Sequence, residues 1–140
     1  TLIEMMIVLA IIAIISAFAI PAYSEYVKRA SRAEAKATLV SAQSALDKCF
    51  QLNRTYFHSA TTPCKISETL AGAGLPTDKK DYVVAFTGTF PSAANKTDFT
   101  LQATRKNAML NDKCGDFTID QISNKGLVNN TDTIAACWGK

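Results

Sequence analysis

The hydrophobic pattern along the chain changes from continuous to periodic. Residues 5–24 carry no charged side chain, and Pro21 and a few hydroxyl-bearing residues are their main interruptions. Beyond Pro21, apolar residues recur every three or four positions as far as Phe50. This spacing is typical of one buried face of a helix. The sequence therefore predicts a single helix of about 50 residues, roughly 75 Å long, that is apolar all round at first and amphipathic afterwards.

The amphipathic part of this helix has a predicted buried face. Charged and amide side chains from Lys28 to Lys48 separate the apolar positions, and alanines, the best helix formers, are frequent. The face consists of Tyr23, Tyr26, Val27, Ala30, Ala33, Ala37, Leu39, Val40, Ala42, Leu46, Cys49 and Phe50. A chain of 140 residues cannot bury the all-apolar first half of such a helix by itself. We therefore expect that half to contact lipid or copies of itself.

Two simpler interpretations of the apolar segment are a cleaved signal peptide and a single-pass membrane anchor. As a helix, residues 5–24 would span about 30 Å, the thickness of a bilayer core. A signal peptide begins with basic residues, whereas here the leading charge is Glu4 and no Lys or Arg precedes the apolar run. A simple anchor does not explain an acid at the edge of apolar surroundings, because such a group is costly without a cation partner.

The N-terminal residues resemble those of a known family. The chain begins TLIEMMIV, continues with AIIAI at residues 10–14, and has AIPAY at residues 19–23. These segments look like the N-terminus of a mature type IV pilin, and the match extends to about residue 30. The family carries an N-methylated residue, usually Phe, directly before the Thr-Leu-Ile-Glu stretch. We therefore expect one further residue before Thr1.

The resemblance implies how such a chain is made and assembled. Family members are anchored in the inner membrane, cleaved by a prepilin peptidase, and packed helix to helix into an extracellular filament by the pilus assembly machinery. Glu4 matches the family glutamate whose carboxylate meets the N-terminal amine of a neighbouring subunit. We therefore expect Glu4 and Thr1 to set the register of assembly, since a buried carboxylate without a cation is neutral or strongly destabilising. Pro21 indicates either a simple kink or, as the family implies, locally extended backbone in the filament.

The second part of the chain is punctuated by turn residues from residue 52 onward. Residues 53–80 are expected to form a connecting loop with a short helical turn at residues 66–70. Runs rich in β-formers follow, separated by turns that include Asn124–Gly126. The expected strands are residues 82–87, 99–104 and 117–120, with residues 134–138 as a candidate for a last short strand.

These elements predict an α+β fold. Three or four antiparallel strands with one apolar face need a cover, and the amphipathic half of the long helix is available for this. The pilin resemblance implies the same arrangement of a long N-terminal helix packed on a small antiparallel sheet. We expect residues 1–25 to form the membrane anchor and filament core, and residues 26–140 to form the head.

The four cysteines allow three pairings. The chain lacks a Cys-x-x-Cys motif and has a single histidine, His58, so a zinc site is not expected. In an exported chain the cysteines are expected to form disulfides. We favour a bond that ties the helix end to the following loop and another that closes the C-terminal region, by analogy with the disulfide-bounded region of the family. The favoured pairs are Cys49–Cys64 and Cys114–Cys137.

Catalysis is not expected from this sequence. His58 stands alone in a polar loop, where we expect it to be solvated. Asp116 and Asp120 are expected to be solvated carboxylates on one strand face, and a calcium site that also used Asp112 would lack the dense ligand spacing of known loops. Acid–base and nucleophilic mechanisms need convergent residues that do not occur here. No phosphate-binding glycine loop, metal or cofactor is expected.

The charge of the chain leaves one binding function open. After residue 25 there are 15 basic and 10 acidic side chains, a net charge of +5. Clustered Lys and Arg release counterions from DNA, and an aromatic ring can stack on a base. The alternative is a solvated surface of mixed charge. The candidates for DNA contact are Lys79, Lys80, Arg105, Lys106 and Trp138, with Lys113, Lys125 and Lys140 as further basic residues.

Taken together, the sequence predicts a structural subunit of an extracellular type IV pilus and not an enzyme. The resemblance implies roles in twitching motility, surface attachment or DNA uptake. One alternative is a minor pilin that binds DNA through its basic face. Another is a type II secretion pseudopilin, for which a head with two disulfides is a poor fit.

Overall fold

A computed structural model describes residues 1–139 and confirms the expected α+β class. The chain divides into two units, Thr1–Ala30 and the head from Ser31 onward. Helix α1 (Leu2–Asn53) contributes to both units and is 52 residues long. The predicted long helix is therefore confirmed.

The first unit is the apolar part of α1. Its large side chains are exposed in the single chain, with Leu2 at 80% and Phe18 at 75%. By length and composition, α1 is the one helix among the described residues that is apolar and long enough to cross a membrane. Pro21 lies inside the helix, where it cannot donate the usual backbone hydrogen bond. The Ser24 hydroxyl donates to the Pro21 carbonyl at 3.0 Å, and the helix continues through this position.

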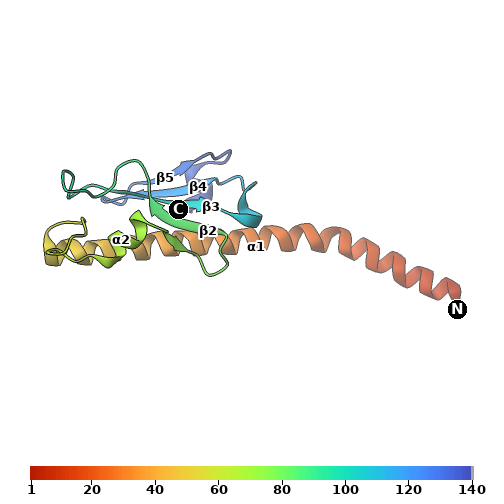
Figure 1. Ribbon diagram of the computed structural model, residues 1–140. Helices are drawn as coiled ribbons and strands as arrows, with labels where there is room; N and C mark the ends of the chain where they lie inside the picture. Colours follow the sequence, from red (N-terminus) through yellow and green to blue (C-terminus); the bar gives the residue numbers. More distant parts are fainter. Residues whose placement is uncertain (140) are drawn as a thin grey trace. The chain divides into compact units, whose positions relative to one another are not determined.

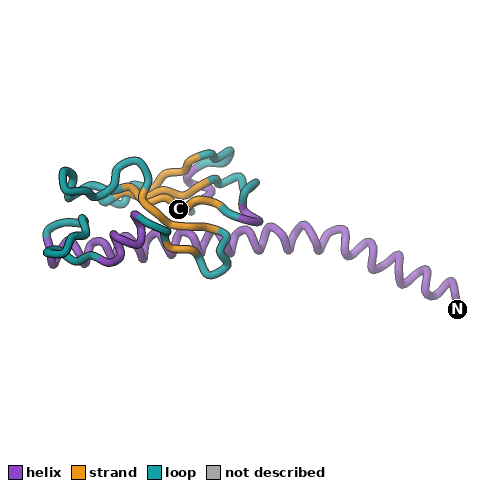
Figure 2. Tube along the Cα trace, in the orientation of Figure 1, coloured by secondary structure: helices purple, strands orange, loops and turns teal. Residues whose placement is uncertain are grey.

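The head contains a five-stranded antiparallel sheet with the strand order β1-β2-β3-β4-β5. Figure 2 shows the strands connected by loops of different lengths. The register pairs Val84 with Ala103 and Leu101 with Ile119. The elements after α1 are α2 (Lys65–Ala71), β1 (Leu75–Pro76), β2 (Tyr82–Phe86), β3 (Thr100–Arg105), the 3₁₀ helix η1 (Asn107–Met109), β4 (Asp116–Asp120), β5 (Lys125–Val128) and α3 (Ile134–Trp138).

The expected last strand was wrong, because residues 134–138 form the short helix α3. The Thr133 side chain accepts a hydrogen bond from the Ala136 N–H at 3.2 Å and so caps the first turn. A turn was expected at Asn124–Gly126, but Lys125 and Gly126 begin the strand β5 instead. Gly126 suits this strand because a Cβ there would lie 2.5 Å from the Thr118 hydroxyl oxygen of β4. The two-residue strand β1 was also not anticipated.

The core of the head lies between α1 and the sheet. Figure 1 shows the sheet along one side of the part of α1 that follows residue 31. Helix residues Ala35, Leu39, Ala42 and Leu46 are buried in one cluster with alternate residues of β2, β3 and β4. Fully burying a side chain such as Leu or Phe contributes about 1.5–3 kcal/mol. The inward strand residues are Tyr82, Val84, Leu101, Ala103, Phe117 and Ile119.

The buried stripe of α1 is narrower than the sequence indicated. Ala33, Ala37 and Val40 were expected on the buried face but are exposed. They lie between the buried positions Arg32, Ala35, Leu39 and Ala42, so the helix presents them away from the sheet. A single sheet covers only one side of a helix. Apolar residues spaced three and four apart form neighbouring rows on the helix surface, and the spacing alone does not show which row the sheet covers.

Two buried ion pairs join the elements of the head. Arg32 of α1 donates from Nε to Asp112 Oδ2 at 3.0 Å, and Arg105 donates from Nε to Asp116 Oδ1 at 3.0 Å. Asp116 also accepts from the Gln102 side chain at 3.1 Å. The expectation that Asp116 is solvated was therefore wrong, because its strand neighbours supply a guanidinium and an amide.

The two expected disulfides are present. Cys49–Cys64 connects α1 to the residue before α2, and Cys114–Cys137 connects the segment before β4 to α3. By chain-entropy estimates, a closed loop of this size contributes about 3 kcal/mol to stability. The Cys49–Cys64 bond holds the end of the loop of residues 54–64 against α1, from which that loop begins.

Removing one partner of the Arg32–Asp112 pair should strongly destabilise the head. We expect Asp112→Ala to lower the free energy of unfolding by about 3–5 kcal/mol, because the guanidinium would stay buried without its carboxylate. Lys113→Ala is the matched control, since it breaks only the more exposed pair between Lys113 and Asp132, at 3.3 Å, and should cost about 0–1 kcal/mol. Thermal and denaturant unfolding of the full chain in detergent measures both. Equal effects of the two substitutions would contradict a stabilising role for the buried pair.

Candidate functional site

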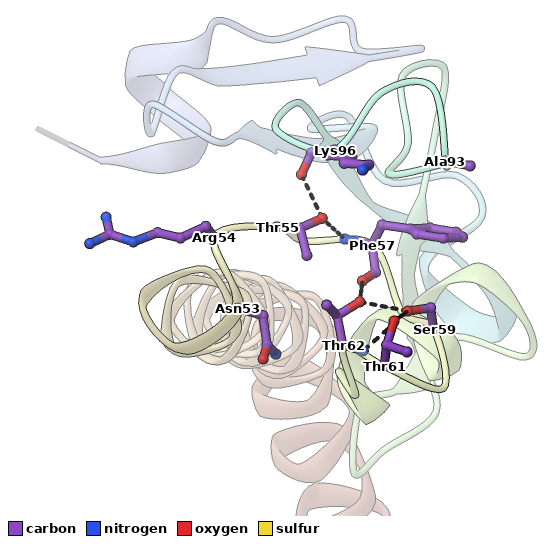
Figure 3. A pocket seen from close by; sticks show the side chains of 9 residues that line it. All are labelled: Asn53, Arg54, Thr55, Phe57, Ser59, Thr61, Thr62, Ala93 and Lys96. Carbon is purple, nitrogen blue, oxygen red and sulfur yellow. Dashed lines mark hydrogen bonds between the residues drawn. The ribbon is translucent and has the colours of Figure 1, made fainter.

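A pocket of about 320 Å³ lies where α1 ends. Figure 3 shows that its walls come from the end of the helix, the loop of residues 54–64, and the loop before β3. Hydroxyl-bearing side chains are frequent in it, and two of its residues are basic. The lining residues are Asn53, Arg54, Thr55, Phe57, Ser59, Thr61, Thr62, Ala93 and Lys96.

Arg54 occupies a strained backbone position at this pocket. Its N–H donates to the Phe50 carbonyl at 2.8 Å, so it directly follows the last turn of α1. Its φ of 56° lies in the left-handed region, where helix ends usually place glycine. A residue with a Cβ costs about 1–2 kcal/mol there. Lys80, Asn107, Ser123 and Asn129 also have a left-handed φ, so this conformation at Arg54 marks the end of α1 and does not by itself indicate function.

The loop after Arg54 is held against the loop that contains Lys96. The Tyr56 N–H donates to the Lys96 carbonyl at 2.9 Å, and the Thr55 hydroxyl donates to the same oxygen at 3.3 Å. The Phe57 N–H in turn donates to the Thr55 hydroxyl at 3.0 Å. These bonds, drawn in part in Figure 3, place two loops that are distant in the sequence at one pocket.

Tyr56 attaches the same loop to α1. Its ring is buried and stacks on Phe50 with the centroids 4.8 Å apart, and its hydroxyl donates to Asp47 at 3.2 Å. Burial, followed by the negative charge and hydrogen bond of Asp47, raises the pKa of Tyr56 to about 12. The hydroxyl therefore keeps its proton and its hydrogen bond throughout the neutral pH range.

The pocket is suited to an anion. Arg54 and Lys96 are exposed at its rim, and Figure 3 shows the guanidinium extending outward on one side. Ser59 Oγ and Thr62 Oγ1, which lie 2.7 Å apart, add hydroxyl groups on another wall. Within residues 1–139 neither cation has a carboxylate partner, and none of the lining residues is acidic. Cations and hydroxyl groups are side chains that commonly bind phosphate, and Figure 3 shows the Arg54 guanidinium on the side away from the hydroxyl groups.

A second pocket of about 300 Å³ shares Phe57 with the first. It contains His58, which was expected to be solvated but is half-buried. The expectation was wrong because the ring packs into the loop, where its Nδ1 accepts the Cys64 N–H at 2.9 Å. Its Nε2 lies 3.6 Å from Glu68 Oε2 on α2.

The structure brings together three of the lysines predicted for DNA contact. Lys79 and Lys80 lie in the turn between β1 and β2, and Lys106 follows β3 beside that turn, with its N–H donating to the Asp81 carbonyl at 2.8 Å. This turn contacts the start of the head's part of α1, which is far from the pocket at the end of the helix. There the Ser31 hydroxyl donates to the Asp81 carboxylate at 2.7 Å. Acidic residues accompany this cluster, and Glu34 accepts the Lys79 N–H at 3.2 Å.

The other two predicted contacts are engaged within the head. The Arg105 side chain is 15% exposed, and besides binding Asp116 it donates from Nη1 to the Asp112 carbonyl at 2.8 Å. The Trp138 indole donates to the Gly126 carbonyl at 2.9 Å and packs edge-on against Phe117. Lys125 Nζ lies over the Trp138 ring, 5.4 Å from its centroid. Lys140 lies outside the described residues.

The predicted assembly residues lie in the first turn of α1. Glu4 Oε2 is 3.1 Å from the Thr1 amine within the single chain, and both side chains are exposed.

A metal site is not formed by the one group of candidate ligands found among the described residues. Cys114, Asp132 and Cys137 place their ligand atoms close together. The two sulfur atoms form a disulfide, however, so neither offers a thiolate.

Sequence reasoning missed the pocket at the end of α1. Arg54 and Lys96 are isolated charges in the sequence, so no run of basic residues indicated them. The one available signal was the frequency of hydroxyl-bearing residues around Ser59, Thr61 and Thr62 directly after a helix end. The hydrogen bonds to the Lys96 carbonyl, which unite the two loops, have no local signature.

Comparisons with known proteins agree with this architecture. The family model described as "Type IV minor pilin ComP, DNA uptake sequence receptor" matches residues 21–118. The type IV major fimbrial protein FimA and a fimbrial protein, both of Dichelobacter nodosus, are each 65% identical to this chain over 34 residues. Those matches cover 24% of this chain and 21% of each relative. Since the family model covers more than half of the sequence, this chain belongs to the type IV minor pilin ComP family.

Proposed function

We propose that this pilin is a filament subunit whose head binds DNA, with the pocket at Arg54 and Lys96 as the phosphate contact. The observation that carries the proposal is a pair of exposed cations without carboxylate partners in the described chain, bordering a pocket lined by hydroxyl groups. The description of the matching family as a DNA uptake sequence receptor supports it.

The physical basis is the exchange of counterions for protein cations. DNA carries condensed cations along its phosphates, and each protein cation that replaces them gains from their release. Arg54 and Lys96 need not break an ion pair before they bind, whereas Arg105 would have to leave Asp116. The hydroxyls of Thr55 and Thr62 already donate to the carbonyls of Lys96 and Phe57, so the two cations are the groups proposed to bind the phosphate.

The location of the pocket favours access to a long polymer. Arg54 lies at the end of α1, about 35 Å along the helix from Ser31 at the rise of an α-helix. The apolar residues that precede the head are the ones expected in the filament core. Within the head, the pocket therefore lies at the opposite end of the helix from Ser31.

The same proposal assigns assembly to the first part of α1. Its exposed apolar side chains require lipid before assembly and neighbouring helices afterwards. Glu4 is proposed to pair with the amine of a neighbouring subunit, as the pilin family implies. An unpaired carboxylate in that apolar core would be strongly unfavourable, so the pairing would select one register.

Replacing Arg54 by glycine separates binding from stability. We expect Arg54→Gly to raise the Kd for a duplex oligonucleotide about ten-fold through loss of a charged contact, and to lower the slope of log K against log salt by about one unit. Because glycine tolerates the left-handed conformation, stability should be unchanged or slightly higher. Fluorescence anisotropy with the full chain in detergent measures binding.

Lys80→Gly is the matched control, because Lys80 is also a cation with a left-handed φ, of 58°. It removes the same charge at the other end of the head. The proposal fails if Lys80→Gly weakens binding and Arg54→Gly does not. That result would instead place DNA at Lys79, Lys80 and Lys106.

Glu4→Ala should prevent filament formation while leaving the protein in the membrane. The alanine removes the carboxylate that would pair with the neighbouring amine, but it keeps the apolar helix. Glu25→Ala is the control, since Glu25 is on the same helix, 4.0 Å from Arg29, and should leave filaments intact. Shearing filaments from cells and fractionating membranes measures both. Normal filaments from Glu4→Ala would rule out the register role.

A further inference from the structure

The end of the head at which α1 enters it carries an exposed surface built from two segments. Lys79 and Lys80 lie in the turn between β1 and β2, and Lys106 and Leu110 flank η1. Figure 1 shows both segments beside the part of α1 that follows Ser31. We call the four side chains the lysine–leucine patch.

Hydrogen bonds fix the two segments of the patch to each other and to the helix. The Asn107 side chain donates to the Lys80 carbonyl at 2.9 Å, and the Lys106 N–H donates to the Asp81 carbonyl at 2.8 Å. The Asp81 carboxylate accepts the Ser31 hydroxyl of α1 at 2.7 Å. The patch is therefore preformed, and a partner need not order it on binding.

Leu110 is exposed because its neighbours are committed to the interior. Met109 is buried in the core, and its carbonyl accepts the Asp112 N–H at 2.9 Å. Asp112 in turn accepts from Arg32 of α1 at 3.0 Å. These contacts leave Leu110 on the outer side, 61% exposed. An exposed leucine beside lysines gains free energy from a partner that offers it an apolar environment.

The charges around the patch are mixed. Within the part of the chain that the structure describes, none of its lysines forms an ion pair. Asp78 is exposed beside them, and Glu34 and Asp81 accept hydrogen bonds from the Lys79 N–H and the Ser31 hydroxyl. Charge alone would therefore attract an anionic partner weakly. DNA phosphates offer nothing to the leucine, whereas an anionic membrane offers phosphates to the lysines and acyl chains to the leucine.

The length of chain between the apolar segment and the patch keeps the patch near the membrane surface when α1 is anchored. Residues 5–24 are long enough to span a bilayer core, and Ser31 follows Ser24 by seven residues, about 10 Å at the rise of an α-helix. The headgroup region is about 5–7 Å thick on each side of the core. The remaining gap is shorter than the screening length of about 8 Å at physiological salt, so lysines beside Ser31 would act on lipid phosphates.

We propose that the lysine–leucine patch docks the head on a membrane that contains anionic lipid while α1 is anchored there. The lysines bind lipid phosphates, and Leu110 enters the boundary between the headgroups and the acyl chains. This inference rests on the membrane stage that the proposed function gives to the first part of α1. Docking would hold the stored subunit in one orientation, and the contact would be lost when the subunit leaves lipid for the filament.

The experiment measures whether position 110 reaches the acyl chains. The full chain is reconstituted in vesicles of phosphatidylglycerol or of phosphatidylcholine, whose acyl chains carry bromine, a short-range quencher of indole fluorescence. Leu110→Trp reports on the patch, and wild type gives the background from Trp138. Phe18→Trp reports on insertion of the apolar segment and should be quenched in both lipids.

Ile122→Trp is the matched control for position. Ile122 is 70% exposed in the turn between β4 and β5. Its neighbour Ser123 accepts from Gln43 at 2.9 Å, and Gln43 lies about 18 Å along α1 from Ser31 at the rise of an α-helix. Ile122→Trp should therefore be quenched no more than wild type in either lipid.

We expect Leu110→Trp to be quenched in phosphatidylglycerol and much less in phosphatidylcholine. Adding Lys106→Gln to Leu110→Trp should lower the ratio of docked to undocked heads about five-fold, because each lysine near an anionic surface contributes to the attraction. Lys48→Gln is the control for charge, since Lys48 is an exposed lysine of α1 seventeen residues beyond Ser31. It should leave the ratio unchanged.

Two results would overturn the inference. One is quenching of Leu110→Trp in phosphatidylglycerol that does not exceed that of Ile122→Trp, and the other is quenching that is equal in both lipids and unchanged by Lys106→Gln. If the first result came with weaker duplex binding by Lys106→Gln, the patch would be a DNA contact instead. Failure of the membrane stage looks different, because Phe18→Trp would then be quenched in neither lipid.

Discussion

The structure depends on one helix, α1, whose first part needs an apolar environment outside the chain and whose second part packs on the chain's own sheet. The first part of α1 exposes apolar side chains that nothing in the single chain covers, whereas the part after Ser31 buries a narrow stripe under the sheet. The hydrophobic effect therefore acts between molecules at one end and within the molecule at the other. Arg32 stands near the start of the buried stripe, where its ion pair with Asp112 connects the helix to the segment before β4.

The site at the end of α1 uses the rigidity of the head. Two covalent or buried attachments, the Cys49–Cys64 bond and the Tyr56–Asp47 hydrogen bond, hold the loop of residues 54–64 to the helix. The Lys96 carbonyl joins that loop to the one before β3. Ordering these groups during folding means that a ligand need not order them on binding, which reduces the entropic cost of recognition. The strained backbone of Arg54 is sustained by the same framework.

Sequence patterns predicted the elements whose signal is local. The length of α1, the strands β2, β3 and β4, and the turn that became α2 follow from periodicity and composition. The strand β5 was missed because it depends on pairing with β4, whereas the helix α3 was missed although its cap at Thr133 is local. The site depends still more on distant contacts. Arg105 could not be recognised as an internal residue without knowing that Asp116 lies beside it on the next strand. Arg54 and Lys96 likewise become neighbours only when the loops meet.

The indole of Trp138 has a consequence for subunits that are crowded together. β5 is an outer strand of the sheet, and outer strands offer unpaired backbone groups to which another chain can add a strand. The Trp138 N–H occupies the Gly126 carbonyl on that strand, and α3 lies beside it. At least one acceptor of this edge is thereby closed to a strand from a neighbouring head.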